Sequence, residues 1–113
     1  MERNLQAKFY KKKLQSLGIV MPRVCKNTFH SFHLFVIQCE KRDKLMKHLH
    51  SKNILTALHY KTPIHLMPGY SSKAQLPETT KLSKRILSLP LYPGLKKSEQ
   101  LKVVTGIKNF YKK

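Results

Sequence analysis

Three side chains that can hydrogen-bond a ligand lie within seven residues, around a turn that contains a proline. They are His59, Tyr60 and His65, and Pro63 stiffens the backbone between them. An imidazole or a phenol in such a turn can bond to a hydroxyl or a phosphate, and a tyrosine ring can also stack. The alternative is a structural role, in which the same groups bond to nearby backbone. The residues alone slightly favour the structural role.

The six histidines and two cysteines show no spacing that is typical of a metal site. His30 and His33 are an odd number of positions apart and would diverge on an extended strand. His48 and His50 would point about 200° apart on a helix. Zinc ligands usually recur at spacings that bring them together on one element or in one loop. We therefore predict no metal site.

Acidic residues are too few for the common hydrolytic mechanisms. The chain has one aspartate, Asp43, and four glutamates, so neither a Ser-His-Asp triad nor a pair of catalytic carboxylates can be argued. We assign no catalytic residue. Cys25 and Cys39 make no disulfide framework and are expected to be small buried side chains.

The apolar pattern predicts helices and strands that alternate along the chain. The expected order is a helix over 2–17, a strand over 32–40, a helix that begins near Asp43, a strand over 55–60, a helix that begins at Pro77 and buries Leu82, Ile86 and Leu89, a short extended segment, and a last helix capped by Ser98. The strand over 32–40 is almost continuously apolar, which suits a strand covered on both faces with His33 in the core. This order predicts an α+β fold, a small, mostly antiparallel sheet packed with helices.

Two helices have apolar positions that we expect to face the core. The first helix has Leu5, Phe9, Tyr10, Leu14 and Leu17 at spacings of three to five. The last helix has Leu101, Val104, Ile107 and Tyr111. Gly18 is placed to end the first helix in a left-handed turn.

The length of 113 residues suits a single domain with one hydrophobic core. We expect the domain to span 1–113, with a lead-in helix and loop over 1–24 and a small α+β domain over 25–113. No apolar run approaches the roughly 20 residues of a membrane-spanning helix. The start also lacks the apolar stretch of a signal peptide. Together with the low cysteine count, this predicts a cytoplasmic protein.

The formal net charge of +18 favours contact with polyanions. The basic residues are nevertheless scattered over every predicted element, and 19 of them are lysines against four arginines. Specific contacts to phosphates and bases favour the two-pronged guanidinium of arginine. We therefore do not expect nucleic acid as the partner. A small basic module that binds nucleic acid or other polyanions is kept as the alternative function.

Five segments of the chain follow one another in an order and at separations typical of one enzyme family. They lie within 3–19, 31–37, 42–54, 59–70 and 87–93, and the most specific are the loop His59-Tyr60 with Pro63-Ile64-His65-Leu66, Pro68 and Tyr70, and the segment Leu87-Ser88-Leu89-Pro90-Leu91-Tyr92-Pro93. Together they resemble the DegT/DnrJ/StrS family of pyridoxal-phosphate (PLP) aminotransferases, which act on nucleotide-linked keto sugars. The resemblance covers nearly the whole chain. It implies the C-terminal small domain of a fold-type I aminotransferase.

The resemblance also implies roles for the residues of the loop. It places His59, Tyr60 and His65 at the mouth of the active site, near the sugar nucleotide and the amino donor, as the substrate-binding candidates. In the intact family, glutamate or glutamine converts the cofactor to pyridoxamine phosphate, which then aminates the keto sugar. Products of that kind enter surface polysaccharides or glycosylated natural products. Tyr70 and Tyr92 are expected to pack, with their hydroxyls at the surface.

One departure from the family's pattern concerns the cofactor. Ser31-Phe32-His33 resembles the start of the family's Ser-Phe-His-x-x-Lys segment, but Val36 stands where the Schiff-base lysine would fall, and no glycine-rich turn follows. We therefore expect no cofactor on this chain alone and no transamination by it. The chain would supply substrate-mouth and dimer surface to a separate PLP-binding lobe. It would be half of a split enzyme, the remnant of a broken gene, or a self-associating leftover.

Overall fold

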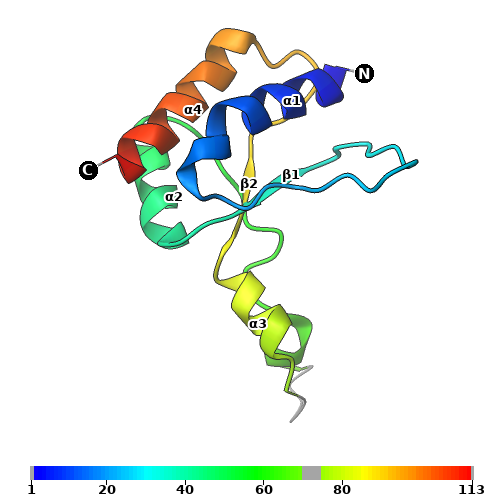
Figure 1. Ribbon diagram of the computed structural model, residues 1–113. Helices are drawn as coiled ribbons and strands as arrows, with labels where there is room; N and C mark the ends of the chain where they lie inside the picture. The colour runs from blue at the N-terminus through cyan, green and yellow to red at the C-terminus, as the bar shows by residue number, and fades with distance from the viewer. Residues whose placement is uncertain (1, 70–74, 113) are drawn as a thin grey trace.

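A computed structural model describes residues 2–69 and 75–112. The helices and strands are α1 (Glu2–Leu14), β1 (Phe35–Gln38), α2 (Arg42–Ser51), α3 (Pro77–Ser83), β2 (Ile86–Leu89) and α4 (Lys97–Tyr111), with single 3-10 turns at Gln15–Leu17 and Ile64–Leu66. Helices α1 and α4 lie side by side over the sheet and α2 packs beside α4, whereas α3 lies apart from them (Figure 1). The predicted α+β class is confirmed.

The two strands form a small antiparallel sheet, as predicted. Phe35 pairs with Leu89 and Ile37 with Leu87, and single bridges from Val20 to Gln38 and from Ala57 to Ser88 extend the pairing at either edge. Because side chains alternate along a strand, Leu87 and Leu89 face the helices while Ser88 points to the opposite face. The sheet therefore separates a helix-covered core from a second face, which carries Val36, Gln38, Ile86 and Ser88.

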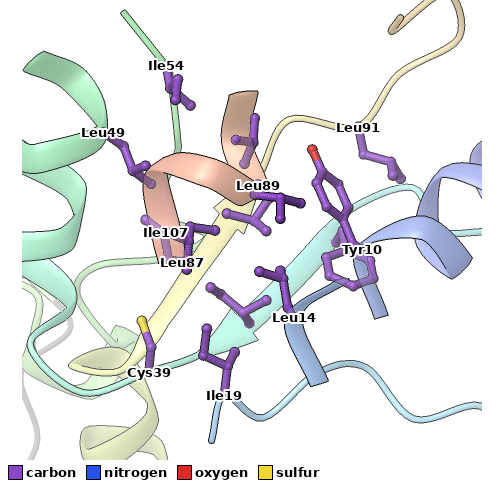
Figure 2. Close-up of a cluster of buried hydrophobic side chains, with 14 of the residues drawn as sticks. Tyr10, Leu14, Ile19, Cys39, Leu49, Ile54, Leu87, Leu89, Leu91 and Ile107 are labelled. Carbon is purple, nitrogen blue, oxygen red and sulfur yellow. The ribbon is translucent and has the colours of Figure 1, made fainter. Parts of the chain in front are cut away.

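The core lies between the sheet and helices α1, α2 and α4. Figure 2 shows Tyr10 and Leu14 from α1 meeting Leu87 and Leu89 from β2. The Tyr10 hydroxyl donates a hydrogen bond of 2.6 Å to the carbonyl of Pro90, and burial raises the pKa of this phenol well above its usual range. Tyr10 thus fixes α1 against the segment that follows β2.

Two leucines that we expected in the core are exposed, for one shared reason. Leu5 is 67% and Leu101 50% exposed, whereas Gln6 and Gln100 are buried. The Gln6 side-chain amide donates to the carbonyl of Tyr92 at 2.9 Å, and the Gln100 amide donates to the carbonyl of Gln6 at 2.9 Å. These two buried amides occupy the α1–α4 contact, where each donates a hydrogen bond, and both leucines lie outward. The predicted inward faces are therefore wrong at these positions.

The strand predicted over 32–40 is shorter and begins only at Phe35. Phe32 has a φ of 50°, a left-handed conformation that interrupts an extended chain. Its amide N–H donates to Nδ1 of His30, and its ring stacks on the His30 ring. His33 is exposed and is not a core histidine. Burial along β1 alternates, so the strand is not fully covered on both faces.

Three other boundaries differ from the prediction. The expected strand over 55–60 is reduced to the single bridge of Ala57, because the chain turns away after one pair of hydrogen bonds with Ser88. Helix α3 ends at Ser83, so Ile86 and Leu89 belong to β2 rather than to the helix. The last helix is capped at Lys96, not Ser98, since the Glu99 carboxylate accepts the Lys96 N–H at 3.0 Å.

Several local predictions are confirmed. Gly18 ends the first helical segment with a φ of 70°, Pro77 stands in the first turn of α3, and Asp43 in the first turn of α2. Cys39 is buried as expected, but Cys25 is exposed, because it lies in an extended loop before β1 rather than in the core.

Candidate functional site

His59 lies against the face of the sheet that carries Ser88. Its Nδ1 is 2.8 Å from Oγ of Ser88, which is only 4% exposed. Backbone bonds between Ala57 and Ser88 place the two segments side by side. The serine hydroxyl therefore fixes the imidazole ring from one side, and Nε2 lies on the opposite edge of the ring.

Tyr60 stands at the surface beside His59. It is 73% exposed, and its ring centroid is 5.4 Å from that of His59 with the two planes 84° apart. The peptide bond between the two residues is cis. The rings touch edge to face, so these neighbours do not diverge as strand alternation predicts. An exposed phenol of this kind can stack on, or hydrogen-bond to, a ligand.

His65 lies inside a small projection formed by residues 60–69 and 75–85, which extends away from the helix-covered sheet (Figure 1). It belongs to the turn Ile64–Leu66 and is 9% exposed. Its Nε2 is 3.3 Å from Oγ1 of Thr80 on α3. His65 therefore joins the proline turn to α3, which is the structural role left open by the sequence.

An apolar groove of about 450 Å³ runs between the proline turn and α3. Its lining includes Tyr60, Ile64, His65, Met67, Leu76 and Leu82. Tyr60 and His65 thus share one hollow, and Tyr60 also contacts His59. The structure brings the three candidates to one side of the sheet, with Tyr60 the most accessible of them. Of the two tyrosines expected to pack with their hydroxyls at the surface, Tyr92 is 46% exposed and Tyr70 lies outside the described residues.

A second hollow, of about 690 Å³, lies on the other side of α3 and carries positive charge. Lys81, Lys84 and Arg85 line it together with His65. Cations beside an apolar groove attract a ligand that combines an apolar or sugar part with a phosphate. The electrostatics of the projection therefore suit a ligand that bears a negative charge.

Ser88 and Thr80 are the polar partners that sequence reasoning missed. Each holds one of the candidate histidines by a side-chain contact. Ser88 carried a usable signal, since it is a lone hydroxyl within the apolar run Ile86–Leu89, where a buried polar group needs a partner. Thr80 carried none, because its contact depends on how α3 meets the proline turn.

The described residues contain no group of three or more histidine, cysteine or acidic side chains placed to hold a metal ion. Over the same residues, no helix has the length and apolar character to cross a membrane.

Several known proteins contain a similar segment as part of a longer chain. The chain is 39% identical over 98 residues to the pleiotropic regulatory protein of Geobacillus stearothermophilus, covering 83% of this chain and 26% of that protein. It is 34% identical over 97 residues to the dTDP-3-amino-3,4,6-trideoxy-alpha-D-glucose transaminase of Streptomyces venezuelae, covering 82% and 26%. The chain thus spans about a quarter of these curated relatives.

A solved structure gives the same result in three dimensions. The structure of DesV from S. venezuelae, in complex with a ketimine intermediate, superposes with a TM-score of 0.93 and 32% identity, over 99% of this chain and 32% of that one. The sequence model of the DegT/DnrJ/EryC1/StrS aminotransferase family matches residues 1–108. This chain belongs to the DegT/DnrJ/EryC1/StrS aminotransferase family.

Proposed function

We propose that these 113 residues form the small, C-terminal, substrate-side lobe of a nucleotide-sugar aminotransferase, and that another lobe supplies the PLP chemistry. The observation that carries this proposal is the superposition on 32% of DesV, over 99% of the present chain, at a TM-score of 0.93. Family membership supports the reaction class. The sugar transaminases among its relatives support a nucleotide-linked keto sugar as the substrate class.

The residues present do not fit the cofactor by themselves. A Schiff-base lysine needs a desolvated pocket, and a carboxylate must face the pyridinium nitrogen. Every described lysine is exposed or half-buried, and all five carboxylate side chains are exposed. Val36 also stands where the family resemblance would put the lysine. These observations support a division of labour in which the 113 residues do not transaminate on their own.

The loop residues then have distinct roles. His59, held by Ser88, offers its imidazole to a sugar hydroxyl or a phosphate. Tyr60 presents an open ring that packs against the substrate or against the facing lobe. His65 shapes the apolar groove by joining the proline turn to α3. The exposed apolar side chains around this groove, Tyr60, Ile64, Leu66 and Leu76, supply the surface that meets the rest of the enzyme or its dimer partner.

A chimera tests this proposal. Residues 1–108 would replace the matching segment of the S. venezuelae transaminase, whose own cofactor site stays intact. The proposal predicts a folded chimera that keeps amino transfer to its dTDP-linked keto sugar, and a His59→Ala version with a raised KM.

The matched control for His59 is His50→Ala in the same chimera, because His50 is exposed on α2 and lines neither hollow of the projection. It should leave KM unchanged. A chimera that folds and binds cofactor but has no amino-transfer activity would contradict the proposal.

A further inference from the structure

A cationic groove lies between α1 and the first turn of α4, on the helical side of the molecule and away from the proline turn. It has a volume of about 570 Å³ and is lined by Leu5, Lys8, Phe9, Lys12, Lys13 and Lys97, among others. We call it the α1–α4 groove. Its lysines come from sequence positions nearly ninety residues apart, and α1 and α4 lie side by side in Figure 1. Folding therefore concentrates charge that looks scattered along the chain.

The positive charge of this groove has little local compensation. Glu2 is the acidic residue in its lining, and its Oε1 already accepts the Gly94 N–H at 2.8 Å. Across the described residues, the one ion pair within 4 Å joins Arg42 to Asp43, outside the groove. The four ammonium groups of the α1–α4 groove are thus offset by a single carboxylate, which leaves the groove with a net positive charge.

Two of these ammonium groups converge on one aromatic ring. Nζ of Lys97 lies 5.6 Å and Nζ of Lys13 lies 5.9 Å from the centroid of Phe9. Lys97 also stands in the first turn of α4, where the helix dipole disfavours a cation. A bound anion would reduce both the repulsion between the ammonium groups and the unfavourable interaction of Lys97 with the helix dipole, whereas solvent screens them only in part.

We propose that the α1–α4 groove binds a phosphate polyanion, a chain of linked phosphates. Lys8 and Lys12 are one helical turn apart, about 6 Å along the axis, so one chain can contact both. Lysine ammonium groups contact phosphates as point charges without reading sequence. Phe9 adds an aromatic surface inside the positive groove, as in sites that hold single-stranded nucleic acid.

Two charge-matched double variants separate this groove from the general positive charge of the chain. Lys12→Gln with Lys97→Gln removes two charges from the groove. Lys44→Gln with Lys52→Gln removes two from exposed positions on and just after α2. Binding of a fluorescent twelve-residue oligothymidylate is measured by anisotropy over a range of salt concentrations, and circular dichroism checks that each variant is folded.

The groove variant should lose more than tenfold in affinity and about 1.4 from the log–log salt slope, since a single strand contributes about 0.7 per neutralised phosphate. The α2 variant should lose less than threefold. Equal losses in the two variants would overturn the proposal, as would failure of the unmodified chain to bind.

Competition distinguishes the sources of phosphate. If inorganic polyphosphate displaces the labelled oligonucleotide at a lower phosphate concentration than unlabelled oligothymidylate does, the ligand is free polyphosphate. The reverse order assigns nucleic acid. The proposal would be overturned if poly-glutamate of equal charge displaced the labelled oligonucleotide as well as the two phosphate polymers do, because the groove would then not select phosphate.

Discussion

The helix-covered sheet and the projection of residues 60–69 and 75–85 are built on different principles. In the first, Tyr10, Phe35, Leu87 and Ile107 are fully buried. Hydrogen bonds also join α1 to α4 and to the segment before it. Among the described residues of the projection, only His65 and Ser83 have buried side chains, while Tyr60 and Ile64 are mostly exposed. Apolar surface left open in this way suits contact with another molecule or lobe. The buried core and the open apolar surface thus occupy separate parts of a small chain.

A pair of tyrosine substitutions should show the largest difference in stability between the two regions. Tyr10→Ala removes a buried ring and should lower the free energy of unfolding by about 3–5 kcal/mol. Tyr60→Ala truncates an exposed ring and should change it by less than about 0.5 kcal/mol. Urea denaturation followed by circular dichroism measures both. Similar losses for the two variants would mean that the projection is part of the core.

A second pair tests the amides between α1 and α4. Gln6→Ala removes the bond to the Tyr92 carbonyl and should cost about 1–2 kcal/mol of unfolding free energy. Leu5→Ala, its neighbour on the open side of α1, should cost less than about 0.5 kcal/mol. The same denaturation curves give the answer. A larger cost at Leu5 would restore the helix face that the apolar spacing predicted.

The smallest effect concerns the contact between the sheet and the loop. Ser88→Ala should shift the tautomer balance of His59, because the hydroxyl beside Nδ1 favours one tautomer of the ring. Nitrogen-15 chemical shifts of the imidazole report this directly. Ser51→Ala is the control, since its hydroxyl bonds to a backbone carbonyl on α2. Unchanged His59 shifts after Ser88→Ala would show that the serine does not position the ring.

Sequence reasoning predicted those parts of the fold that depend on local rules. Gly18, Pro77 and Asp43 mark helix ends through backbone geometry and the helix dipole, and each stands where expected. It failed where polar groups from distant segments satisfy one another. Gln6 and Gln100 bury their amides only because α1 meets α4, and no single-helix pattern contains that contact.

In the candidate site, the identity of the residues was predicted from the sequence but their geometry was not. The family resemblance selected His59, Tyr60 and His65, and their roles in substrate binding stay a prediction. Their geometry was not predictable, since an alternating strand was expected where the chain makes only one bridge at Ala57. The contact of His65 with Thr80 likewise depends on the docking of α3 against the proline turn.

We propose above that these 113 residues complete an aminotransferase without carrying its cofactor chemistry. The direct test mixes the purified chain with PLP, reduces with borohydride and maps any adduct by mass spectrometry. We predict only scattered, substoichiometric adducts on surface lysines and no amino transfer to a nucleotide-linked keto sugar. A stoichiometric adduct at one lysine, with turnover by the chain alone, would contradict it.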